Sequence, residues 1–152
     1  MRRLPALTSI TTLILALSLS ACGEPEDTRP GQPVAHRRAA FKDILEVFEP
    51  MGQMLQKDTL DTRTFQALAQ QLVAKRDAPW NYFGADTRYP PSHARAEVWS
   101  EAEKFAASKK AFFDATDKLA AAAGGGDRKQ LAAAYTAVQD SCKSCHKAFK
   151  ER

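Results

Sequence analysis

The chain has 152 residues, which is enough for one ordinary domain and too few for two. Hydrophobic residues make up 44% and charged residues 26%, a composition that excludes an intrinsically disordered chain. The net charge of +4 is too small, and the basic residues too scattered, for a nucleic-acid-binding protein. Three cysteines cannot form a closed set of disulfides, because one is left over.

Residues 1–21 have the pattern of a secretory signal peptide. Arg2 and Arg3 form a basic start, and residues 4–19 carry no charge. This apolar stretch of about 16 residues is short for a transmembrane helix, which needs about 20. The sequence LSAC at residues 19–22 resembles a bacterial lipobox, in which the cysteine receives lipid and becomes the new N-terminus. The alternative is an ordinary signal peptide that ends near a cysteine.

The mature chain is therefore expected to be a periplasmic lipoprotein anchored through Cys22. Gly23 is not the aspartate associated with inner-membrane retention, which favours the outer membrane. Removing the leader leaves 20 basic and 18 acidic residues, so no general attraction to anionic lipid is needed. Residues 22–33 are rich in proline and glycine, which predicts a flexible tether behind the anchor.

From residue 34 onward the hydrophobic residues recur with a helical period. A first helix is expected over 34–57 with a kink at Pro50, and a second over 61–76 with Asp61 as its cap. Residues 77–93 contain three prolines and four aromatic residues, which predicts a long, packed loop without helix. The apolar stripe of the first helix comprises Val34, Phe41, Leu45, Phe48, Met51 or Gly52, and Leu55.

A third helix is expected over 94–123, ended by the three glycines at 124–126, and Asp127 then caps the last helix. The last helix carries a heptad-like seam of Leu131, Tyr135, Val138, Cys142, Cys145 and Phe149. Because no strand pattern is present, the sequence predicts an all-α fold. Residues 34–152 are expected to form an up-down-up-down four-helix bundle, with an irregular helical array as the alternative.

The pentapeptide CKSCH, from Cys142 to His146, is the attachment signature of c-type haem. Two thiols at this spacing add across the two vinyl groups of one haem edge, and the adjacent histidine becomes the axial ligand of the iron. A zinc site needs four protein ligands, and the mature chain offers besides this motif only His36 and His93. A thioredoxin-type pair would accompany a βαβ pattern, and a plain disulfide would leave His146 without a role. We therefore predict one covalent haem c held by Cys142, Cys145 and His146, with a pocket beside His146.

A C-x-x-C-H motif on the last helix of such a bundle resembles the class II cytochromes, specifically cytochrome c′. The resemblance covers residues 34–152 and rests on the segment CKSCHKAF at 142–149, the segment ARAEVWS at 94–100, and the pair Arg37 and Phe41. It implies Arg37 and Arg38 near the haem propionates, His93 near the haem edge, and Lys150 on the proximal side. Many members pair through their first two helices, so a homodimer is one expectation, although the lipobox departs from the family pattern.

Bundle topology places the end of the last helix beside the start of the first, so Phe41 is expected on the distal side of the haem. Low-spin class II cytochromes have a methionine at the position that we match to Phe41, and phenylalanine cannot coordinate iron. Met51 lies roughly 15 Å further along the helix axis, and we expect Met51 and Met54 to be packing residues at the far end.

These observations predict a five-coordinate haem that binds nitric oxide or CO in an apolar pocket and can pass electrons. One alternative is a dedicated electron carrier with a six-coordinate haem. A haem enzyme would need a distal acid–base group, for which the sequence offers no candidate, so none is expected. A haem-free helical scaffold is the remaining alternative. The sequence identifies no redox partner.

Overall fold

The computed structural model describes residues 25–57 and 60–151. The predicted signal peptide and Cys22 lie outside the described residues. The long helices are α1 (Pro33–Gln56), α2 (Thr62–Lys75), α4 (Ala102–Gly125) and α5 (Arg128–Phe149). A 3-10 helix, η1 (Ala78–Tyr82), and the short helix α3 (Glu97–Ser100) lie between α2 and α4.

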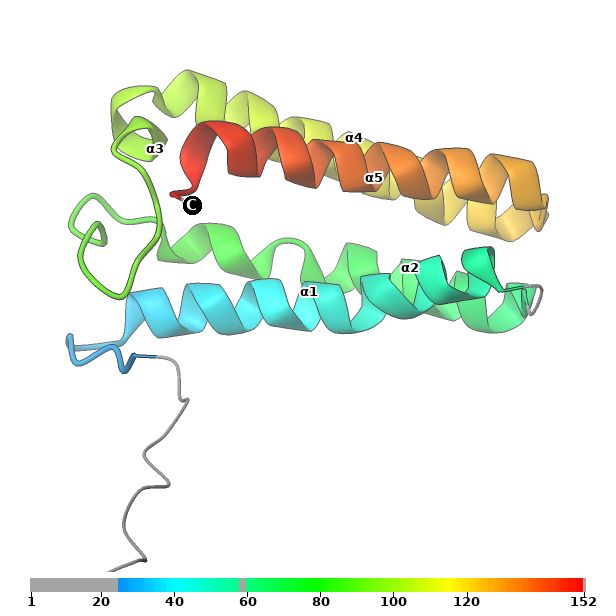
Figure 1. Cartoon of the computed structure of the whole chain (residues 1–152), viewed down its shortest axis with the longest axis horizontal. Coiled ribbons are helices and arrows are strands. Elements are labelled where there is room, and N and C mark those ends of the chain that lie inside the picture. The colour runs from blue at the N-terminus through cyan, green and yellow to red at the C-terminus, as the bar shows by residue number, and fades with distance from the viewer. Residues whose placement is uncertain (1–24, 58–59, 152) are drawn as a thin grey trace, which may run out of the picture.

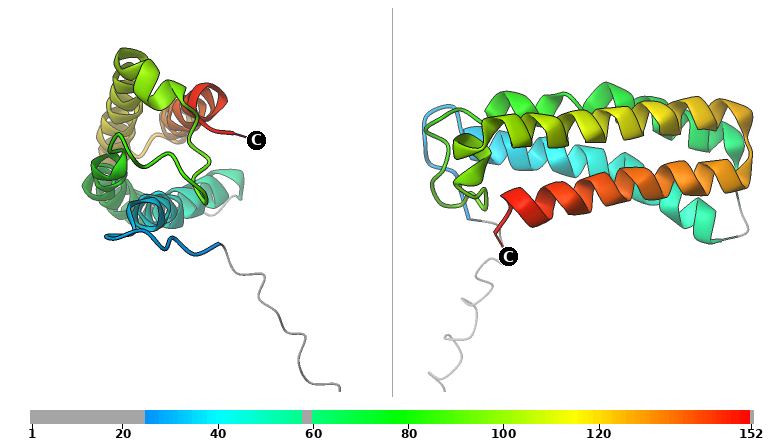
Figure 2. Two further views of the ribbon diagram at one scale, coloured as in Figure 1. Left: turned by 90° about the vertical axis from the view of Figure 1, so that its left-hand side faces the viewer. Right: turned by 90° about the horizontal axis from the view of Figure 1, so that it is seen from above.

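The four long helices run alternately up and down, as predicted (Figure 1). The end view shows them at the corners of a bundle (Figure 2), in the order α1, α2, α4 and α5 around it. Three sides of this bundle are closely packed, whereas α1 and α5 meet more sparsely. No strand occurs in the described part of the chain, where an isolated bridge joins Ala94 to Lys150. None of the described helices has the length and apolarity needed to span a membrane.

One continuous core fills the bundle. Its largest fully buried side chains come from all four helices, with Met51 on α1, Phe65 on α2, Leu119 on α4 and Leu131 on α5. The predicted caps are present, because Asp61 accepts hydrogen bonds from Arg63 and Thr64, and Asp127 accepts one from Gln130. Gly126 ends α4 in the left-handed conformation that favours glycine. The helix α1 runs continuously through Pro50, and the predicted kink there stays a prediction.

The predicted helix over 94–123 is interrupted, and this prediction was wrong at its start. Residues 94 and 95 pair with the end of α5, where the Arg95 backbone N–H donates to the Phe149 carbonyl. The Trp99 indole donates to the carbonyls of Phe83 and Gly84, which holds α3 against the preceding loop. The chain therefore turns at Glu101 before α4 begins.

Two further differences concern loops. The prediction of no helix over 77–93 missed η1, whose start at Ala78 and Pro79 suits a tight helical turn. The predicted flexible tether over 22–33 is tied to the bundle at Asp27, although the neighbouring residues 25, 26 and 28–32 are exposed. Asp27 is 1% exposed and accepts hydrogen bonds from the backbone N–H groups of Val34 and Ala35 at 2.8 and 3.2 Å. It thus caps α1 from a distance, because the side chain of Gln32 makes no capping hydrogen bond.

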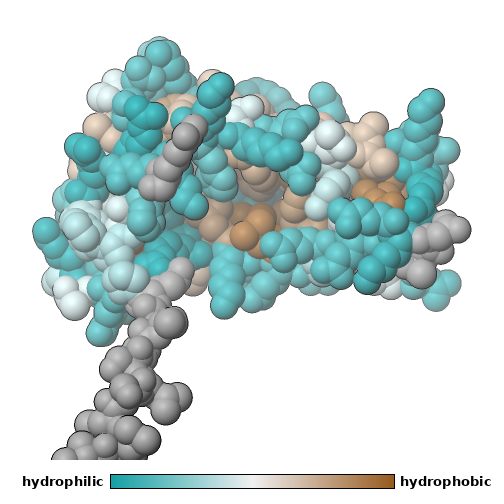
Figure 3. Space-filling model, in the orientation of Figure 1, coloured by the Kyte–Doolittle hydropathy of each residue, from teal (hydrophilic) through white to brown (hydrophobic). Residues whose placement is uncertain are grey.

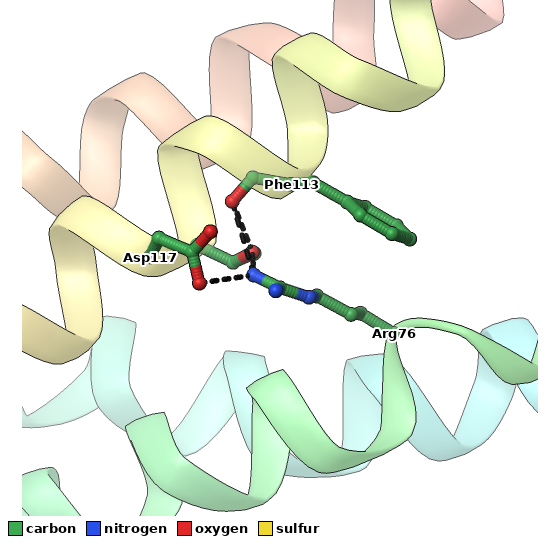
Figure 4. A network of polar contacts seen from close by, with 4 residues as sticks. Arg76, Phe113 and Asp117 are labelled. Carbon is green, nitrogen blue, oxygen red and sulfur yellow. Dashed lines mark hydrogen bonds and ion pairs between the residues drawn. The ribbon is translucent and has the colours of Figure 1, made fainter. Parts of the chain in front are cut away.

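A polar cluster at the end of α2 fixes η1 (Figure 4). Arg76 Nη1 donates to the Phe113 carbonyl, to Thr116 Oγ1 and to Asp117 Oδ1, with the last contact at 2.6 Å. Its guanidinium also lies over the Phe113 ring, 4.6 Å from the centroid. The Arg76 carbonyl in turn accepts a hydrogen bond from the indole of Trp80 at 2.7 Å. This cluster joins α2 to α4 and sets the position of Trp80.

Candidate haem site

The C-x-x-C-H motif occupies the last two turns of α5, which are held firmly against the rest of the protein. The Glu151 backbone N–H donates to the His93 carbonyl. The Lys150 backbone N–H donates to the His146 carbonyl, which is the last hydrogen bond of the helix. On the inner face of α5, Val138 and Phe149 are buried and Cys142 packs against the core. The predicted seam is therefore confirmed, and it carries the motif.

Both cysteines of the motif are free thiols and half-buried. Burial raises the pKa of Cys142 and, together with the charge of Cys142, raises the pKa of Cys145 to about 11. At neutral pH both groups are therefore protonated thiols. No group of three or more histidine, cysteine or acidic side chains is placed to hold a metal ion within the described ranges. The alternatives of a disulfide and a zinc site gain no support from this arrangement.

His146 opens onto a hollow of about 640 Å³, as the sequence predicted. The residues that line the hollow are His93, Lys143, His146, Lys147, Lys150 and Glu151. Partial desolvation and then the charge of Lys150 lower the pKa of His146, although the residue as a whole is exposed. The lowered pKa favours the neutral imidazole, which is the form that binds a metal ion.

The face of α1 turned toward α5 carries an uncovered apolar side chain. Leu45 is 47% exposed, whereas the sequence predicted it to be buried, and Ile44 takes the buried position instead. Phe48, three residues later, stacks on Tyr135 of α5 at 4.2 Å, so this face of α1 is directed toward α5. Figure 3 shows apolar surface in a depression between the two helices. Leu45 is exposed because α1 and α5 stand apart in this region.

A group of five aromatic rings connects the start of α1 with the end of α5. We call it the aromatic wall, and it consists of Phe41, Trp80, Phe83, Phe105 and Phe149. Phe41 meets Trp80 and Phe83 edge-on at 5.6 and 6.4 Å between ring centroids. Phe105 then contacts Phe83 at 4.9 Å and Phe149 at 5.2 Å. Phe149 follows His146 by three residues, so Phe41 lies at the motif end of the bundle, as the topology predicted.

The methionines lie elsewhere. Met51 is fully buried in the core, and Met54 packs against it. Gly52, next to Met51, lies against Tyr135, which precedes His146 by about 16 Å along α5 at 1.5 Å per residue. The prediction that these methionines pack at the far end of the core is therefore confirmed.

The other predicted site residues fall into two groups. His93 and Lys150 line the hollow beside His146. The buried guanidinium of Arg37 instead donates to the carbonyls of Tyr82 and Thr87 and to the hydroxyls of Thr87 and Ser92. Arg38 donates to the Pro25 carbonyl at 3.3 Å. Neither arginine lines the hollow, and their predicted contact with the propionates stays a prediction.

Arg37 contacts the aromatic wall through the ring of Phe83. Its guanidinium lies 4.3 Å from the centroid of the Phe83 ring while it holds the segment 82–92 on α1. This role of Arg37, and the places of Trp80 and Phe83 in the wall, were not predicted from the sequence, whereas bundle topology already placed residues 98–105, and so Phe105, beside the haem. Four aromatic residues within a proline-rich loop were the available signal, and they indicated packing without indicating a partner.

The arrangement fits a covalently attached haem. Two unpaired thiols one helical turn apart and an adjacent neutral imidazole are the donor set of haem c. The uncovered Leu45 and the edge of Phe41 offer an apolar face on the opposite helix. Cys142, Cys145 and His146 would hold the group, and its chemistry would be that of a haem iron beside an apolar wall.

Comparisons with known proteins agree with this arrangement. A family model described as cytochrome C′ matches residues 32–150. The cytochrome c′ of Alcaligenes xylosoxydans xylosoxydans is 33% identical over 125 residues, covering 82% of this chain and 97% of the relative. That of Rubrivivax gelatinosus is 32% identical over 126 residues, covering 82% and 98%.

Solved structures give the same result. The crystal structure of cytochrome c′ from Rubrivivax gelatinosus has a TM-score of 0.76 at 31% identity, covering 83% of this chain and all of that one. A nitric oxide complex of a cytochrome c prime variant from Alcaligenes xylosoxidans has a TM-score of 0.76 at 33% identity, with 84% and 100% covered. A carbon monoxide complex of another variant of that protein has the same score, identity and coverage.

Proposed function

Because the chain belongs to the cytochrome c′ family, whose members carry one covalently attached haem c, we propose that it binds nitric oxide or CO at a five-coordinate haem iron. The observation that carries this proposal is the aromatic wall. Phe41 stands at the motif end of α1 with its ring edge-on to Trp80 and Phe83, and a phenyl ring has no lone pair to donate to iron.

Each residue of the site has a distinct part in this function. Haem supplies an iron that can bind a diatomic gas and change its oxidation state. Cys142 and Cys145 fix the group to α5 through thioether bonds, and the neutral imidazole of His146 serves as the protein ligand. Phe41 and Leu45 present apolar surface from α1.

The five rings of the aromatic wall, all within the described residues, offer no unused hydrogen-bond donor, which favours nitric oxide and CO over oxygen. Bound oxygen is stabilised by a distal hydrogen-bond donor. The Trp80 indole N–H is already donated to the Arg76 carbonyl at 2.7 Å, and the other four rings of the wall carry no donor. The relatives from Alcaligenes xylosoxidans solved with nitric oxide and with carbon monoxide lend further support.

The haem of this protein can also transfer electrons, but we do not propose electron transfer as its dedicated function. A six-coordinate carrier would need a sixth protein ligand, and the two methionines of the core lie near Tyr135 rather than near His146. An enzyme would need an acid–base group on the distal side, and the five rings of the wall provide none.

We propose that the protein works in the periplasm, anchored to a membrane by lipid on Cys22. The proposal is supported by the charged start, the apolar segment and the LSAC sequence. Cys22→Ala should abolish labelling by radioactive palmitate and release the haem protein into the soluble periplasmic fraction. A wild-type protein that is already soluble, with cleavage elsewhere, would show that the segment is an ordinary signal peptide.

CO binding to the reduced holoprotein tests the gas-binding proposal. Before CO is added, the absorption spectrum should be that of a high-spin haem. During the titration it should convert completely to the spectrum of the CO complex in a single binding step. An iron that takes up CO only after a sixth protein ligand has dissociated would support the electron-carrier alternative.

A further inference from the structure

The described chain begins at the same end of the bundle as the haem motif. The carboxylate of Asp27 accepts hydrogen bonds from the backbone N–H groups of Val34, Ala35 and Arg29. It also accepts a hydrogen bond of 2.9 Å from the hydroxyl group of Tyr89. Tyr89 lies four residues before His93, whose carbonyl accepts the N–H of Glu151 at the end of α5. Residue 27 is therefore fixed to the end of the bundle that carries His146.

The anchor proposed at Cys22 is only five residues from this fixed point. Five residues span at most about 18 Å when fully extended, at up to 3.6 Å each. The helix α4 alone is about 36 Å long at 1.5 Å per residue, which is twice the greatest length of the link. The link therefore keeps the haem end of the bundle near the lipid, whereas the opposite end is free to lie far from it.

The hollow at the end held near the lipid is lined by three lysines and one acidic residue, although the whole mature chain is nearly neutral. Lys143 and Lys147 are exposed on one face of α5, and Lys150, which is also the residue expected on the proximal side of the haem, is exposed directly after the helix ends. Glu151 is the one acidic residue that lines the same hollow. The ammonium groups of Lys147 and Lys150 make no ion pair within residues 25–57 and 60–151. Lys143 reaches Asp140 at 3.8 Å, with both side chains mostly exposed. We name Lys143, Lys147 and Lys150 the lysine face.

We propose that the lysine face docks on the anionic lipid headgroups of the membrane that holds the anchor, so that the haem end of the bundle faces the bilayer. This inference rests on the lipid anchor of the proposed function. The short link from Cys22 to Asp27 supplies the proximity, and the lysine face supplies the charge complementarity. A gas dissolved in the lipid, or a redox partner within it, would then approach the haem end directly.

Lysine footprinting on the lipidated holoprotein tests the proposal. The protein is reconstituted in vesicles of phosphatidylcholine alone or with about a third phosphatidylglycerol, and each lysine is acetylated in a short pulse and measured by mass spectrometry. Lys143, Lys147 and Lys150 should react on the order of fivefold more slowly in the anionic vesicles, the factor that corresponds to one lysine at such a surface. Lys118 near the end of α4 and Lys129 at the start of α5 lie at the opposite end of the bundle and should react equally in both vesicles. High salt should remove the difference at the lysine face.

A pair of double variants provides the matched control. In Lys147→Gln with Lys150→Gln, the protection of Lys143 should fall, whereas Lys118→Gln with Lys129→Gln should leave it intact. Equal reactivity of the lysine face in both vesicles would overturn the proposal, since lysines facing water, an acidic protein or the haem carboxylates would behave in this way. A chain that does not float with phosphatidylcholine vesicles would overturn it together with the lipid anchor.

Discussion

Replacing Phe41 by alanine tests how the aromatic wall controls access to the iron. Truncating a fully buried phenylalanine costs about 3–5 kcal/mol, and Phe41 is half-buried, so Phe41→Ala should cost about 2–3 kcal/mol. For a domain of this size, the melting temperature should fall by roughly 6–15 °C. An incoming gas must displace the ring from two edge contacts, with Trp80 and Phe83, each worth about 0.5–1.5 kcal/mol. Removing the ring should therefore speed CO association by roughly tenfold.

Flash photolysis of the CO complex measures the association rate, and thermal unfolding measures the stability. The matched control is Phe48→Ala, two turns further along the same face of α1, where the ring stacks on Tyr135. The control should lower the melting temperature without changing CO association. Phe41→Met should instead offer a thioether and move the iron toward low spin. If Phe41→Ala binds CO at the wild-type rate, a residue other than Phe41 holds the distal position.

The remaining predictions concern attachment, the distant cap and the support of the wall. The double variant Cys142→Ser, Cys145→Ser should lose the mass of one haem from the denatured chain, and a retained haem mass would contradict attachment there. Burial raises the pKa of Asp27. Hydrogen bonds from Arg29, Ala35, Tyr89 and Val34 outweigh this effect, so the pKa of Asp27 lies below its ordinary value. Its stabilisation is present above the unfolded pKa of about 3.9 and is lost as the pH falls through the folded pKa. Asp27→Asn should therefore melt below the wild type from pH 7 to 5, and the difference should shrink at lower pH; a constant difference would exclude a role of the charge. Arg37→Met removes four hydrogen bonds and should cost about 2–4 kcal/mol, measured by urea unfolding, while Arg38→Met should cost far less.

The helices and the motif could be predicted because each depends on local chemistry. Asp61 and Asp127 are capping residues beside periodic apolar segments, and Gly126 takes a left-handed conformation that few other residues adopt. The spacing of Cys142 and Cys145 on the seam of α5 follows from helical geometry alone. The place of Phe41 at the motif end follows from the alternation of four helices.

Features set by contacts between distant residues could not be predicted. Asp27 caps a helix that starts six residues later, and nothing in a proline-rich segment indicates such a cap. Arg37 reads as an exposed charge in sequence, yet carbonyls of the 82–92 segment bury it. Residues 94–95 have helical composition, but pairing with the end of α5 takes their backbone out of the helix.

The resonance Raman spectrum of the reduced holoprotein at neutral pH tests the central claim most directly, because its marker lines report the spin state and coordination number of the iron. We expect the lines of a high-spin, five-coordinate haem with a histidine ligand, converted by CO to a six-coordinate low-spin spectrum. Low-spin, six-coordinate lines in the protein without added gas would mean that a protein side chain binds the iron on the face that we assign to Phe41, and the haem would then not be five-coordinate.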